Sequence, residues 1–107
     1  MPKGIMVVRS NPSDPAREDE YNDWYSNTHL ADVRAVPGFV SARRYKVRGG
    51  EGDGPAHSYL AIYEIEADDL EAPLAELRAR SASGRIKMSD AVQLDPPPVV
   101  TFYELIE

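Results

Sequence analysis

The sequence contains no cysteine, two histidines and one tryptophan. Without cysteine the chain can form no disulfide, thiolate nucleophile or thiolate metal site, and two histidines leave any metal cluster dependent on carboxylates. We therefore expect no metal site. Long apolar runs are also missing, and the run near the N-terminus ends at Arg9, which is too short for a signal sequence or a membrane span. The cytoplasm is the expected location.

The charge balance is acidic, with 12 Lys and Arg against 18 Asp and Glu and a net charge of -6. Such a surface opposes binding to nucleic-acid phosphates and to anionic membranes, so neither is an expected partner. The apolar fraction of 42% and the length of 107 residues suit one hydrophobic core. We predict a single domain over residues 1–107.

Turn residues and hydrophobic patterning divide the chain into six elements. The first helix is expected to begin at Pro15, with Asp14 as its cap, and to end by Val36 before Pro37 and Gly38. The second helix follows Asp68 and Asp69 and ends before Gly84, while residues 49–55 form a flexible connection and residues 85–95 are ambiguous. Strands are expected at 4–9, 39–47, 57–66 and 99–106.

The resulting order, βαββαβ, predicts a ferredoxin-like α+β fold, in which an antiparallel sheet carries two helices on one face. Several expected strands bear apolar or aromatic residues on both alternating faces. A monomer would therefore expose one apolar sheet face. Pairing of two copies through that face, as in a dimeric α+β barrel, is the simple remedy, so we predict a homodimer.

The first helix carries a stripe of residues three or four positions apart that includes Tyr21, Tyr25, His29 and Val33. A neutral imidazole at His29 can accept and return a proton near pH 7, which makes His29 the best acid/base candidate. Tyr25 could donate a hydrogen bond to a carbonyl or phenolate oxygen, and Asn22 could anchor a polar substituent. A histidine in an inward stripe is also often a satisfied core residue, so both interpretations stay open.

Aromatic residues supply further candidates for substrate binding. Trp24 lies at the edge of the stripe, where it either packs or stacks on a substrate. Tyr45, Tyr63 and Tyr103 lie on three different expected strands, and those on the helix-facing side would meet His29 across a pocket. Ordinary strand packing is the alternative for each of them.

Two adjacent arginines, Arg43 and Arg44, point to opposite faces of an expected strand, so one of them reaches a given cavity. We select Arg44 as a candidate for binding a carboxylate or enolate. His57 follows a glycine-rich stretch that has no phosphate-loop pattern, so nucleotide binding has little support.

Residues 20–33 read EYNDWYSNTHLADV, and residues 36–39 read VPGF. Together with the element order, these residues resemble the signature of EthD-like members of the dimeric α+β barrel superfamily. The resemblance implies a homodimer whose sheets form a shared barrel, with a small-molecule pocket between sheet and helices in each subunit. It also implies that His29 matches the pocket histidine of the family.

Characterised members of this superfamily include cofactor-independent monooxygenases, dehydratases, decarboxylases, cyclases and lactone isomerases, often acting on aromatic polyketides or catabolic intermediates. The resemblance therefore implies a small-molecule enzyme that needs no cofactor and uses His29 and Tyr25 on an aromatic or enolisable substrate. A non-catalytic ligand-binding or stress-associated dimer is the alternative. Haem binding through His29 is a third possibility, although an acidic chain offers few cations for the propionates.

Overall fold

The computed structural model describes residues 2–48, 57–86, 89–94 and 97–106. The expected connection at 49–55 lies outside these residues. The elements, in chain order, are β1 (Lys3–Ser10), the 3-10 turn η1 (Pro15–Arg17), α1 (Glu18–Trp24), the π-helical turn η2 (Tyr25–His29), α2 (Leu30–Arg34), β2 (Phe39–Lys46), β3 (Tyr59–Glu66), α3 (Glu71–Ala82) and β4 (Val99–Glu104).

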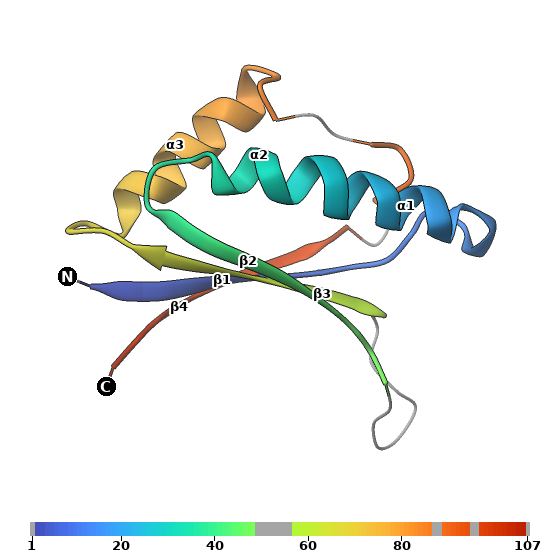
Figure 1. Ribbon diagram of the computed structural model, residues 1–107, viewed down its shortest axis with the longest axis horizontal. Helices are drawn as coiled ribbons and strands as arrows, with labels where there is room; N and C mark the ends of the chain where they lie inside the picture. Colours follow the sequence, from blue (N-terminus) through green and yellow to red (C-terminus); the bar gives the residue numbers. More distant parts are fainter. Residues whose placement is uncertain (1, 49–56, 87–88, 95–96, 107) are drawn as a thin grey trace.

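The four strands form one sheet in the order β2-β3-β1-β4, and every neighbouring pair is antiparallel. The segment from α1 to α2 and the helix α3 both lie over the same face of this sheet (Figure 1). This arrangement confirms the predicted ferredoxin-like α+β fold. Within the described ranges, no helix combines the length and the apolar character of a membrane span.

The helix boundaries follow the signals expected from the sequence. The Asp14 carboxylate accepts a hydrogen bond from the Ala16 backbone N–H at 2.8 Å, and Pro15 occupies the first turn. The Asp69 carboxylate accepts a hydrogen bond from the Glu71 N–H at 3.0 Å at the start of α3. Gly38 ends the first helical segment with a φ of +100°.

The turn η2 was not expected, because the sequence pattern predicts an uninterrupted α-helix. The Leu30 N–H donates to the Tyr25 carbonyl five residues earlier, which defines the wider π turn. In an α-helix, residues four apart advance by about 40°, so a long stripe drifts off the sheet. The wider turn offsets this drift, and Tyr21, Tyr25 and Val33 are all 3% exposed or less.

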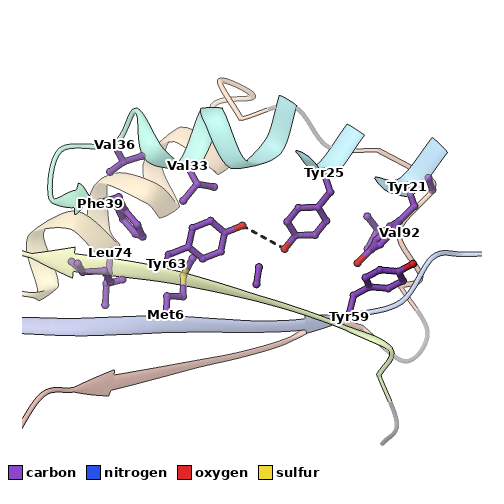
Figure 2. Packing of buried hydrophobic residues seen from close by; sticks show 13 residues of the cluster. Met6, Tyr21, Tyr25, Val33, Val36, Phe39, Tyr59, Tyr63, Leu74 and Val92 are labelled. Atoms are coloured by element: carbon purple, nitrogen blue, oxygen red, sulfur yellow. Dashed lines mark hydrogen bonds between the residues drawn. The ribbon is translucent and has the colours of Figure 1, made fainter. Parts of the chain in front are cut away.

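The hydrophobic core fills the space between the helices and the sheet (Figure 2). Segment 89–94, which the sequence left ambiguous, closes one end of it with the buried residues Ala91 and Val92. The Ser13 N–H donates to the Ala91 carbonyl at 2.6 Å and so fixes this segment. The core residues are Met6, Tyr21, Tyr25, Val33, Val36, Phe39, Tyr59, Ala61, Tyr63, Ile65, Leu74, Ala91 and Val92.

The other face of the sheet has no helix over it (Figure 1). Alternation along the paired strands places Ile5, Leu60 and Ile62 on this face, with Tyr45 and Tyr103 beside them. The two tyrosines are 47% and 49% exposed. The outer face thus carries apolar and aromatic side chains together with the charged residues Arg43 and Glu64, and no helix covers it in a single chain.

Replacing Gly38 with Ala should destabilise the fold. A Cβ at Gly38 would lie 2.5 Å from Pro73 Cγ of α3, and the positive φ adds backbone strain. We expect the free energy of unfolding to fall by about 2 kcal/mol or more in urea denaturation. Gly84→Ala is the matched control, because Gly84 has a φ of +79° with nothing within 4 Å. Equal losses in the two variants would contradict the clash with α3.

Candidate functional site

A cavity of about 820 Å³ lies between the helices and the half of the sheet formed by β1 and β4. Volume and lining are typical of small-molecule sites, which are mostly apolar with a few placed polar groups. The polar side chains in the lining are Ser10, Tyr25, His29, Arg78 and Ser81. The apolar walls come from Met6, Val8, Trp24, Val33, Leu77, Ala82, Val92, Leu94, Pro98, Val100 and Phe102.

His29 lies in the lining between two aromatic rings. Its imidazole stacks on Trp24, with 4.7 Å between ring centroids, and meets the Tyr25 ring edge-on at 5.0 Å. Nδ1 is buried and has no hydrogen-bond partner among the described residues. Burial lowers the pKa of His29 to about 4; the nearby Asp32 opposes this effect and Arg44 adds to it. The imidazole is therefore neutral at pH 7.

Tyr25 lines the cavity and is held by a second tyrosine. The Tyr63 hydroxyl donates to the Tyr25 oxygen at 3.4 Å, as the dashed line in Figure 2 shows. Burial raises the pKa of Tyr25 to about 12 and raises that of Tyr63 well above its usual range, so both phenols keep their protons at pH 7. Because Tyr63 supplies the donor in this pair, the proton of Tyr25 is available to a ligand oxygen.

Ser10 is a polar residue of the cavity that the sequence reasoning missed. It is 2% exposed, and its Oγ shares a hydrogen bond of 2.5 Å with the Tyr21 hydroxyl. The alternation of β1, which sends Met6 and Val8 to the same face, was the available signal.

Arg44 lies on the helix side of β2, on the far side of Tyr25 from the cavity. Its guanidinium carbon is 4.4 Å from the Tyr25 ring centroid and 5.2 Å from those of Tyr21 and Tyr59, and Nη1 donates to Ser26 Oγ at 3.0 Å. Arg44 does not line the cavity. Its contact with the site is a cation–π contact with the Tyr25 ring, and binding of a substrate carboxylate or enolate by Arg44 stays a prediction.

The remaining helical candidates divide between the cavity and a separate hydrogen-bond network. Trp24 lines the cavity and stacks on His29. Asn22 instead donates to the Tyr59 hydroxyl at 3.2 Å, and that hydroxyl donates to Glu18 at 2.7 Å. Asn22 is absent from the cavity lining, and its role as an anchor for a polar substituent stays a prediction.

The strand tyrosines do not share one face. Tyr63 points toward the helices, whereas Tyr45 is paired with Leu60 and Tyr103 with Ile5, on the outer face. Of these three tyrosines, Tyr63 therefore lies on the helix-facing side that His29 shares, and substrate binding by Tyr45 and Tyr103 stays a prediction. Side chains of a strand alternate between its two faces with a period of two residues. A shift of one residue in register therefore moves every side chain of the strand to the opposite face.

Distant segments of the chain complete the cavity. Leu77 and Arg78 come from α3, while Val100 and Phe102 come from β4. Alternation along β4 could have suggested Val100 and Phe102 from the sequence, but the contribution of α3 depends on how that helix packs.

No group of three or more metal-ligating His, Cys, Asp or Glu side chains occurs in the described part of the chain.

No protein-family model and no curated protein sequence matches the chain. Solved structures do, and they share the dimeric ferredoxin-like fold. An EthD family protein from Bacillus halodurans C-125 is 19% identical with a TM-score of 0.67, covering 99% of this chain and 100% of its own. A dimeric ferredoxin-like protein from an uncultured marine organism is 9% identical, with a TM-score of 0.65 and coverage of 100% and 98%.

A mutant of MhuD, with two manganese protoporphyrin IX molecules bound per active site, is 13% identical to the chain. Its TM-score is 0.66, and the match covers 97% of this chain and 95% of MhuD. These likenesses confirm the ferredoxin-like α+β fold and the structural resemblance to EthD family proteins. At these identities they establish the fold alone, since one fold hosts many functions.

Acidification should destabilise the protein through His29. Its pKa falls from 6.5 to about 4 on folding, so the unfolded chain binds more protons between these values. The free energy of unfolding should therefore decrease as the pH is lowered through this range, with about 3 kcal/mol as the upper bound of the His29 contribution. Urea denaturation at several pH values measures this slope. A His29→Gln variant with an unchanged slope between pH 6.5 and 4 would contradict this origin.

Proposed function

We propose that the chain is a small-molecule enzyme that performs acid/base chemistry without a cofactor on an aromatic or enolisable substrate. The observation that carries this proposal is the neutral imidazole of His29, with its unpartnered Nδ1, beside the Tyr25 hydroxyl in an apolar cavity of about 820 Å³. A buried nitrogen without a partner is costly, so a ligand group that pairs with it gains free energy.

In this proposal, His29 removes a proton from a carbon or oxygen atom of the substrate and later returns it. The electron pair left behind becomes an enolate or phenolate, whose oxygen accepts a hydrogen bond from Tyr25. Trp24 provides a flat surface for the ring of the substrate. Tyr63 and Arg44 hold Tyr25 in place from behind. Dehydration, cyclisation, isomerisation and decarboxylation are the reaction types that this proposal covers, together with oxygen insertion in which dioxygen is the oxidant that reacts with the enolate or phenolate.

Haem fits the cavity less well than a small aromatic or enolisable molecule does. The two propionates of haem need cationic partners, and Arg78 is the one lysine or arginine among the described residues that line the cavity. We therefore assign no step to haem. A non-catalytic ligand-binding dimer remains the competing function, and it would bind an aromatic ligand in the same cavity without moving a proton.

The test is α-deuterium incorporation into 2-tetralone, a ketone that joins an aromatic ring to an enolisable carbon. In D₂O, the wild-type protein should accelerate exchange of the α-protons, followed by ¹H NMR. His29→Gln should lower the acceleration by about 10²- to 10⁴-fold, because it removes the proton acceptor. Tyr25→Phe should lower it less, since the base remains.

His57→Gln is the matched control, because His57 lies at a separate hollow beside β3, away from His29. His57→Gln should keep the wild-type exchange rate. Circular dichroism should show that His57→Gln and His29→Gln both fold. Equal exchange by wild type and folded His29→Gln would refute the role of His29. Binding of 2-tetralone by the wild-type protein without acceleration would favour the non-catalytic dimer.

We also propose that the protein is a homodimer that pairs through the outer face of the sheet. Solved structures of this fold are described as dimeric, and this face carries Ile62, Tyr45 and Tyr103 with no helix over them. Covering such a face with a second copy removes apolar surface from water.

Ile62→Lys should dissociate this dimer, because it places a charge at the centre of the buried face. Sedimentation equilibrium should give twice the chain mass of 11.9 kDa for the wild type and a single chain mass for the variant. Ala75→Lys, which adds the same charge on the exposed side of α3, should remain dimeric. A dimeric Ile62→Lys variant would contradict pairing through this face.

A further inference from the structure

The cavity contains one charged side chain that the proposed chemistry does not use. Of the described residues that line it, Arg78 alone carries a formal charge at pH 7, since His29 is neutral and no Asp or Glu takes part. The net charge of the whole chain is -6. The lining therefore has the opposite sign to the molecule that encloses it.

Arg78 is an exposed residue of α3 that lines the cavity. On the same helix, Arg80 forms an ion pair with Glu76 at 3.0 Å and donates to the Ala35 carbonyl at 3.2 Å. No ion pair or hydrogen bond of the Arg78 side chain occurs within the described ranges. A ligand in the cavity could therefore pair with this exposed guanidinium without breaking an ion pair among the described residues.

Ser81 lies three residues after Arg78 and lines the same cavity, so the guanidinium and a hydroxyl share one face of α3. Guanidinium and hydroxyl groups together are suited to a carboxylate, which accepts several hydrogen bonds. The carbonyl end of α3 at Ala82 repels anions, so Arg78 has to supply the attraction.

We propose that Arg78 selects ligands that carry a carboxylate on an otherwise apolar aromatic skeleton. The carboxylate binds Arg78 and Ser81, while the rings fill the apolar cavity that also contains His29 and Tyr25. This inference rests on the proposed function only in that both use the same cavity. It adds a specificity-determining residue from a helix other than the one that carries the acid/base pair.

The test compares two fluorescent probes of equal ring system, anthracene-2-carboxylate and 2-(hydroxymethyl)anthracene, by titration at low salt. The wild-type protein should bind the carboxylate about 3- to 10-fold more tightly than the neutral alcohol, as expected for a charge-assisted pair near solvent. Arg78→Gln should abolish this preference and leave the affinity for the alcohol within about twofold. Raising the salt concentration should weaken the preference.

Arg34→Gln is the matched control, because Arg34 is an exposed arginine of α2 that does not line the cavity. This variant changes the net charge equally and should keep the preference for the carboxylate. Equal affinities of the wild type for both probes, or an equal loss in both variants, would overturn the inference. Failure of both probes to bind would overturn it together with the ligand-binding cavity. If the preference for the carboxylate is observed and accelerated proton exchange is not, the proposed chemistry of His29 is refuted and the selectivity of Arg78 still stands.

Discussion

The packing of Tyr21 and Tyr25 between the first helical segment and the sheet is the constraint on which the rest of the structure depends. Both rings are buried, so both hydroxyls need partners inside the protein. Ser10 of β1 pairs with Tyr21, and Tyr63 of β3 pairs with Tyr25. These two contacts fix the rotation of the helix about its axis, and the π turn that begins at Tyr25 carries this orientation forward to His29 and the residues of α2.

Tyr25 also divides the helix-facing side of the sheet into two unlike halves. On the β2 side, the guanidinium of Arg44 lies against three tyrosine rings and fills the space. On the side of β1 and β4, mostly apolar side chains line the cavity of about 820 Å³. A cation and a cavity therefore lie on opposite sides of one phenol ring, which gives Tyr25 support behind and access to a ligand in front.

Burial of His29 and Tyr25 links the electrostatics of this site to its packing. The same burial that lowers the pKa of His29 keeps the phenol of Tyr25 protonated, so a proton acceptor and a hydrogen-bond donor exist side by side at neutral pH. This pairing of a neutral base with a neutral donor suits the formation of an enolate or phenolate. Arg78 adds the one formal charge of the lining and lies on α3, which the acid/base pair does not use.

The sequence by itself determined the features that depend on local chemistry. The caps at Asp14 and Asp69, the stop at Gly38 and the alternation of β3 are encoded within a few residues, and they define the βαββαβ order and hence the fold. The spacing of Tyr25 and His29 likewise placed both side chains toward the sheet. Tertiary structure alone decided which strand tyrosines face the helices, because a shift of one residue in pairing reverses a strand. It also decided that Ser10 and Arg78 join His29 in one cavity, since that depends on how β1 and α3 pack against the first helix across the whole length of the chain.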